Sequence, residues 1–160
     1  MNFNKLRFNP FAICLWMSVA IMLHIFWLKP KTVIIPDVKL RLAVAFVAIV
    51  FTLTLHELIH FFMARVLCEK KPHIKISRDL MGIPAPVTFF DGSASAPRKI
   101  IIWLAPLVLM TVGLDIAFIF MPKITLFLLI VAGSNLAGCF YDILDVLETL
   151  AVQKNRKRTD

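Results

Sequence analysis

Two histidines four residues apart, with a glutamate beside the first, form the pattern His56-Glu57-Leu58-Ile59-His60. Residues four apart on an α-helix lie on one face, so both imidazoles can reach a single zinc ion. Glu57 lies one residue further round the helix, where its carboxylate can take a proton from a metal-activated water. The spacing therefore predicts a metal site that holds Zn²⁺ through His56 and His60, with Glu57 as the catalytic base.

The helix that must carry this pattern belongs to a strongly apolar chain. Of its 160 residues, 59% are hydrophobic and 18% are charged, whereas soluble domains usually contain about 45–50% apolar residues. Four apolar segments are long enough to cross about 30 Å of hydrocarbon as helices. They are residues 11–28, 42–67, 100–121 and 124–150. We therefore expect an all-α integral membrane protein with four transmembrane helices, in a single membrane domain over residues 1–160.

The His-Glu-His pattern lies inside the second apolar segment, 42–67. Each ionisable group at the middle of a membrane helix costs about 2.5–3.5 kcal/mol on insertion scales. Three such groups within five positions therefore indicate a function rather than ordinary core packing.

Lys and Arg residues are distributed unevenly between the two sides of a four-span chain. The amino terminus, the loop 68–99 and the tail hold twelve of them, whereas the two opposite connections hold five. By the positive-inside rule, both termini and this loop face the cytoplasm in a cell membrane. The net charge of +8 then indicates basic loops against anionic lipid, and we expect no nucleic-acid partner.

A third metal ligand is predicted by comparing depths in the membrane. The second and fourth segments run in the same direction, and His60 and Asp142 each lie 18 positions after the start of their segment. At 1.5 Å per residue, both lie about 10–12 Å below the cytoplasmic ends of their helices. Asp142 is therefore the candidate carboxylate ligand, and a set of two imidazoles and one carboxylate favours zinc.

The charges of this group agree with a bound metal. Zn²⁺ balances the two carboxylates of Asp142 and Glu57, whereas without metal both would be buried without a cation. Asn135 lies seven residues before Asp142, on the same helix face. We expect it to bind the backbone of a substrate or to orient a ligand imidazole, and a hydrogen bond that only packs two helices together is the alternative.

The loop 68–99 is the only sizeable segment outside the predicted helices. Residues 73–77 alternate between polar and apolar side chains, residues 86–90 favour a strand, and the residues between them favour a turn. We expect either a short β-hairpin on the cytoplasmic surface or a plain connecting loop.

An H-E-x-x-H on one span, followed by an aspartate on a later parallel span, resembles the site-2 protease type of intramembrane zinc metalloprotease. The resemblance is closer still to the compact bacterial membrane proteins described as putative zincin peptidases, and it covers residues 42–148. It implies His56, His60 and Asp142 as metal ligands and Glu57 as the catalytic base. It also implies hydrolysis of membrane-spanning or membrane-anchored polypeptides.

The chain departs from the site-2 protease pattern near the third ligand. Those enzymes tend to have Asn-Pro upstream and Leu-Asp-Gly at the aspartate, whereas here Asn135 is followed by Leu136 and Asp142 by Ile143. The departure affects the substrate class more than the metal ligands.

Other functions use the same ligands. A divalent metal transporter or sensor would need polar groups that continue across the bilayer, and zinc flux into sealed vesicles would identify it. A zinc-bound membrane scaffold would bind partners without cutting them. A non-peptide hydrolase that acts on a lipid head or an acyl amide is an alternative within the enzyme class.

Overall fold

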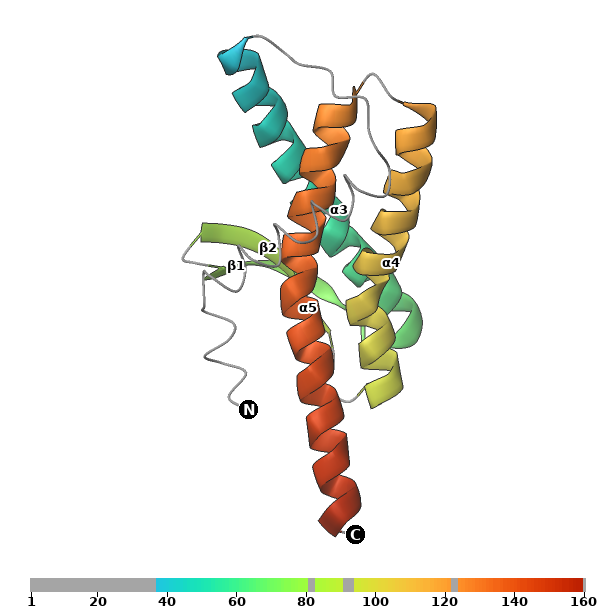
Figure 1. Cartoon of the computed structure of the whole chain (residues 1–160). Coiled ribbons are helices and arrows are strands. Elements are labelled where there is room, and N and C mark those ends of the chain that lie inside the picture. Colours follow the sequence, from blue (N-terminus) through green and yellow to red (C-terminus); the bar gives the residue numbers. More distant parts are fainter. Residues whose placement is uncertain (1–36, 81–82, 91–93, 122–123, 160) are drawn as a thin grey trace.

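The computed structural model describes residues 37–80, 83–90, 94–121 and 124–159 of the chain. The elements follow in the order α3 (Val38–Leu67), β1 (His73–Leu80), β2 (Ile83–Phe89), α4 (Ala96–Phe120) and α5 (Thr125–Thr159). Figure 1 shows the three helices packed as a bundle with the two strands on one side of it.

All three helices are long and apolar enough to cross a membrane. They contain the predicted segments 42–67, 100–121 and 124–150 almost entirely, so the expectation of a mostly helical protein with long apolar helices is confirmed. The first predicted span, 11–28, lies outside the described residues.

The helices extend beyond the apolar segments because local signals set their ends. Asp37 caps α3, and its carboxylate accepts a hydrogen bond from the amide of Lys39 at 2.8 Å. Pro97 lies in the first turn of α4, where a missing amide hydrogen costs nothing. Helix α5 continues through the basic tail to Thr159, since Lys, Arg and Gln are good helix formers. The apolar pattern therefore marks the part suited to hydrocarbon rather than the whole helix.

Helix α3 buries one narrow stripe of residues at four-residue spacing. The stripe consists of Ala48, Thr52, His56, His60 and Ala64. Small residues above and below the two histidines let other helices approach closely, and α3 packs against both α4 and α5. The same stripe that carries the chemistry is therefore the packing face of the helix.

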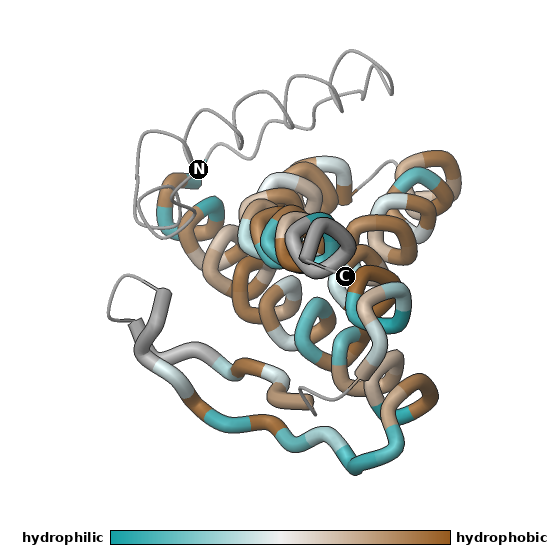
Figure 2. Tube along the Cα trace, turned by 90° about the horizontal axis from the view of Figure 1, so that it is seen from below, coloured by the Kyte–Doolittle hydropathy of each residue, from teal (hydrophilic) through white to brown (hydrophobic). Residues whose placement is uncertain are grey.

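The core and the outer surface of the bundle are both apolar. A buried cluster joins α4 and α5 to the start of the stripe of α3, and it contains Ala48, Met110, Leu114, Phe118, Leu128, Val131 and Ala132. Large apolar side chains such as Phe46, Val66, Ile119 and Phe120 are exposed on the outside, and Figure 2 shows apolar residues over much of the helices. This surface suits contact with lipid.

The segment between α3 and α4 contains an antiparallel β-hairpin, so of the two expected alternatives the structure has the hairpin and not the plain loop. β1 pairs with β2 from His73↔Phe89 to Leu80↔Ile83, with an irregularity between Ser77 and Leu80. In Figure 1 the hairpin lies beside the bundle at about the middle of α5, not beyond the helix ends. Strand β2 contacts α3, so the hairpin reaches the part of α3 that carries the candidate site.

Candidate metal centre

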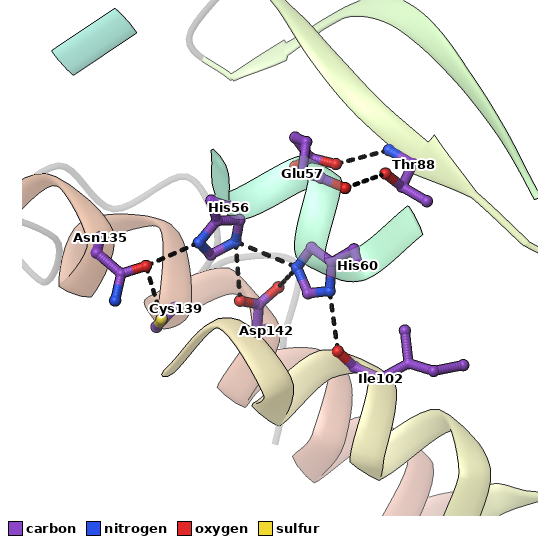
Figure 3. A network of polar contacts seen from close by, with 8 residues as sticks. All are labelled: His56, Glu57, His60, Thr88, Ile102, Asn135, Cys139 and Asp142. Carbon is purple, nitrogen blue, oxygen red and sulfur yellow. Dashed lines mark hydrogen bonds and ion pairs between the residues drawn. The ribbon is translucent and has the colours of Figure 1, made fainter. Parts of the chain in front are cut away.

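Helices α3 and α5 bring His56, His60 and Asp142 together inside the bundle. One possible ligand atom from each lies within 4.8 Å of the other two. The Nε2 atoms of His56 and His60 each lie 3.2 Å from an oxygen of Asp142. All three residues are buried, with 5–7% of their surface exposed. Figure 3 shows both rings directed at the carboxylate. The expected convergence of the two distant helices is thus present in the structure.

The outer nitrogen of each ring has a hydrogen-bond acceptor. His60 Nδ1 lies 2.9 Å from the backbone oxygen of Ile102, and His56 Nδ1 lies 3.0 Å from Oδ1 of Asn135. A carbonyl oxygen can only accept, so each Nδ1 carries the hydrogen and donates it. In neutral rings, both Nε2 atoms are then unprotonated and face inward.

The inward-facing atoms are all electron-pair donors. The two Nε2 atoms lie 3.1 Å apart, and Oδ2 of Asp142 is buried without a hydrogen-bond partner. Lone pairs this close repel one another, and a buried carboxylate without a cation is costly. A metal ion removes both problems, and two imidazoles with one carboxylate are a ligand set that zinc accepts. The residues present therefore fit a zinc ion.

A proline on α4 supplies the acceptor for His60. Pro106 lies inside the helix and has no amide hydrogen, so the carbonyl of Ile102, four residues earlier, lacks its usual helical donor. His60 Nδ1 takes that place. Because a metal-ligating histidine is oriented by the partner of its second nitrogen, Pro106 indirectly orients His60.

Helix α5 passes directly over the ring of His56 at a glycine. A Cβ atom built on Gly138 would lie 3.0 Å from Cε1 of His56 and 3.3 Å from its Nδ1. Any side chain at this position would require the imidazole to shift by at least a few tenths of an ångström, so glycine allows the close approach of α5 to His56.

Asn135 lies one turn from Gly138, and its side chain faces His56. It is 1% exposed, and its Oδ1 also accepts a weak hydrogen bond from Sγ of Cys139 at 3.8 Å. These contacts orient the His56 ring, which is one of the two roles expected for Asn135. A contact with substrate stays a prediction.

Glu57 lies apart from the three ligand atoms and contacts the hairpin. Its Oε2 accepts a hydrogen bond from the backbone amide of Thr88 at 2.7 Å, and Thr88 Oγ1 donates to the backbone oxygen of Glu57 at 2.9 Å. Figure 3 shows Glu57 turned toward strand β2 while the two histidines point toward Asp142. The candidate base is thus held by a residue 31 positions away in the chain.

The sequence analysis missed Thr88 and Ile102. A signal existed for Ile102, because a proline inside a helix always frees the carbonyl four residues before it. No local pattern marks Thr88, since its role depends on where the hairpin packs.

The fold and the site define a helical protein whose long apolar helices hold two histidines and one aspartate close enough to share a metal ion. The chain belongs to the putative zincin peptidase family, whose model matches residues 49–157. The match includes His56, Glu57, His60 and Asp142. Zinc is the metal that a zincin family implies, in agreement with the ligand set. No curated protein and no solved structure matches the chain.

Proposed function

We propose that this protein is a membrane-embedded zinc metallopeptidase of the site-2 protease type, which hydrolyses peptide bonds of membrane-associated polypeptides. The single observation that carries the proposal is the buried convergence of His56, His60 and Asp142, with the remaining ring nitrogens bound outward. The family match supports a peptidase, and the length and apolar character of the helices support a site within the membrane.

The residues have distinct roles in the proposed reaction. His56, His60 and Asp142 hold zinc, which when bound supplies a Lewis acid that lowers the pKa of water and polarises a carbonyl group. Glu57 takes a proton from the attacking water, whose oxygen bonds to the peptide carbonyl carbon. Glu57 then delivers the proton to the nitrogen as the C–N bond breaks. Asn135 and the Ile102 carbonyl keep the two rings in place.

The hairpin supports a polypeptide as the substrate. Strand β2 pairs with β1 along one edge, and its other edge meets α3 at Thr88, beside Glu57. Residues 84 and 86 on this edge are prolines and the Thr88 amide is bonded to Glu57, so an extended polypeptide laid along the edge would donate its amide hydrogens to backbone oxygens there. The excess of Lys and Arg in residues 68–99 and in the tail supports entry from the cytoplasmic side, with these segments against anionic lipid.

The test compares wild type with Glu57→Gln, both in detergent and loaded with zinc. The probe is a synthetic library of apolar 20-residue peptides, and mass spectrometry detects new peptide ends. We expect wild type to cut a subset of the peptides. The variant should bind one zinc per chain but cut none, since its amide cannot accept the proton. Equal cleavage by the variant would show that Glu57 is not the base.

Metal transport is the alternative that uses the same ligands. A path across the membrane would need polar groups with free hydrogen-bonding capacity on the buried stripe of α3. Apart from the two histidines, the buried stripe of α3 holds one hydroxyl, that of Thr52, and two alanines, which make a poor path for a cation. We therefore favour hydrolysis. Zinc uptake by sealed vesicles that contain the protein, without any cleavage of the peptide library, would reverse this preference.

A further inference from the structure

Thr88 contacts Glu57 through two different groups at once. Its backbone amide donates to the Glu57 carboxylate at 2.7 Å, and its hydroxyl donates to the Glu57 backbone oxygen at 2.9 Å. The first bond involves a charged acceptor and is therefore of the stronger kind. Together the two bonds join the hairpin both to the side chain and to the main chain of one residue of α3.

The strand register explains why the Thr88 amide is available. In an antiparallel pair, residues alternate between positions that bond across the ladder and positions that do not. Pro86, opposite Ile76, has no amide hydrogen and so occupies a position that does not donate across the ladder. Thr88, opposite Ile74, lies two residues further along and is therefore also at a position that does not donate across the ladder. The amide of Thr88 therefore points away from β1, toward α3. The two preceding positions of the same phase, residues 84 and 86, are prolines and have no amide hydrogen. Thr88 therefore carries the first amide hydrogen on this part of the edge.

The contact restricts the carboxylate of Glu57. A glutamate on a half-exposed helix face samples several rotamers, and ordering it costs side-chain entropy. The Thr88 amide holds Oε2, so the other oxygen, Oε1, is the one left to take the proton of water. A catalytic group that is already ordered loses less side-chain entropy when the transition state forms.

We propose that Thr88 is the positioning residue of Glu57, and that the β-hairpin thereby sets the direction of the catalytic base. This inference rests on the proposed function, because it assigns Glu57 the role of base. Thr88 itself acts through Glu57 and touches neither the metal ligands nor the reacting atoms. The hairpin is then part of the catalytic apparatus as well as an edge for polypeptides.

The first test measures the bond without any substrate. Hydrogen exchange of the Thr88 amide is followed by NMR in the full-length, zinc-loaded protein, for wild type, Glu57→Gln and Glu57→Ala. We expect exchange to be about tenfold faster or more in the alanine variant, and intermediate in the glutamine variant, which keeps a neutral acceptor. The Val87 amide, which has the opposite phase and faces β1, is the internal control and should not change.

The second test measures catalysis with a peptide that the library screen finds to be cut. Thr88→Ser keeps both donors and should retain the kcat of wild type within about twofold. Thr88→Val loses the hydroxyl, and Thr88→Pro also loses the amide hydrogen without breaking the β1 ladder. We expect kcat to fall about threefold in Thr88→Val and more than tenfold in Thr88→Pro, with KM and zinc content unchanged in both.

Thr54→Val is the matched control for the hydroxyl. Thr54 is exposed on α3, and its Oγ1 donates to Val50 within the same helix. The substitution should leave kcat unchanged.

The outcomes separate this inference from the proposed function. If Glu57→Ala leaves the exchange of the Thr88 amide unchanged, the inference is wrong, whatever the protein cuts. If wild type cuts no peptide, the proposed function fails, and the exchange result still decides whether Thr88 holds Glu57. If peptides are cut and Thr88→Pro keeps the kcat of wild type, or Thr88→Ser is as slow as Thr88→Pro, Thr88 does not position the base.

Discussion

A single methyl group at Gly138 should weaken zinc binding while leaving the fold intact. In Gly138→Ala the new Cβ would lie 3.0 Å from Cε1, 3.3 Å from Nδ1 and 3.4 Å from Nε2 of His56. The three distances are similar, so the methyl group would press on the ring as a whole. The imidazole has to retreat by a few tenths of an ångström.

The site offers the ring little room to retreat. Its Nδ1 is bonded to Asn135 and its Nε2 faces Asp142, so a shift disturbs both sides. Metal–ligand distances are tolerated only within about 0.2 Å of their ideal values. Changes to the groups that orient ligands typically reduce metal affinity about 10–100-fold. We therefore expect the zinc dissociation constant to rise by about 10–100-fold, or about 1.4–2.7 kcal/mol.

The assay is a zinc titration in competition with a coloured chelator, together with thermal unfolding in the presence and absence of zinc. Gly113→Ala is the matched control, because a Cβ on Gly113 has nothing within 4 Å. Alanine is a better helix former than glycine by about 1 kcal/mol. Gly113→Ala should therefore stabilise the protein slightly with or without zinc, and it should not change zinc affinity.

The decisive comparison is between the two glycine variants. Wild-type zinc affinity in Gly138→Ala would contradict this prediction, because it would mean that His56 either does not lie against Gly138 or does not bind the metal. An equal loss of affinity in Gly113→Ala would show that the effect comes from helix stiffness and not from the contact.

Substitutions at three further positions test the remaining parts of the candidate site. Asp142→Asn should reduce zinc affinity more than 100-fold, since a lost ligand costs more than a disturbed one. In chelator, however, it should unfold at the same temperature as wild type or higher, because it removes a buried charge. Asn135→Ala should reduce zinc affinity about 10–100-fold by leaving Nδ1 of His56 without an acceptor, and Asn135→Asp, which keeps an acceptor, should lose less. Pro106→Ala should raise the unfolding free energy of the metal-free protein by about 1 kcal/mol or more. It should also lower zinc affinity, because its new amide competes with His60 for the same carbonyl; a fall in both quantities would indicate a general packing defect instead.

The apolar pattern predicted much of the helical architecture. The segments 42–67, 100–121 and 124–150 all lie in long helices, apart from residue 121 and residue 124 at their margins. Hydrophobic length predicts such helices because a buried or lipid-facing backbone must satisfy its own hydrogen bonds. The ends were less predictable, since caps such as Asp37 and the helical continuation of the tail do not depend on hydropathy.

The relation between His60 and Asp142 was also accessible from the sequence. Two parallel helices with a fixed rise per residue place equivalent positions at equal depth, so counting residues was enough to bring them to one level. Counting does not give rotation about the helix axis. That α5 turns Asp142 and Gly138 toward His56 is a result of packing.

The sequence by itself determined the apolar helices, the four-residue spacing of the histidines and the depth of Asp142. Each of these follows from residue types and their spacing along the chain, together with the fixed rise per residue of a helix. Tertiary structure alone decided which groups surround those ligands. The Ile102 carbonyl meets His60 and the Thr88 amide meets Glu57 across 42 and 31 positions of the chain. Such contacts depend on how whole elements pack, and packing is set by the combined shapes of many side chains that no local pattern encodes.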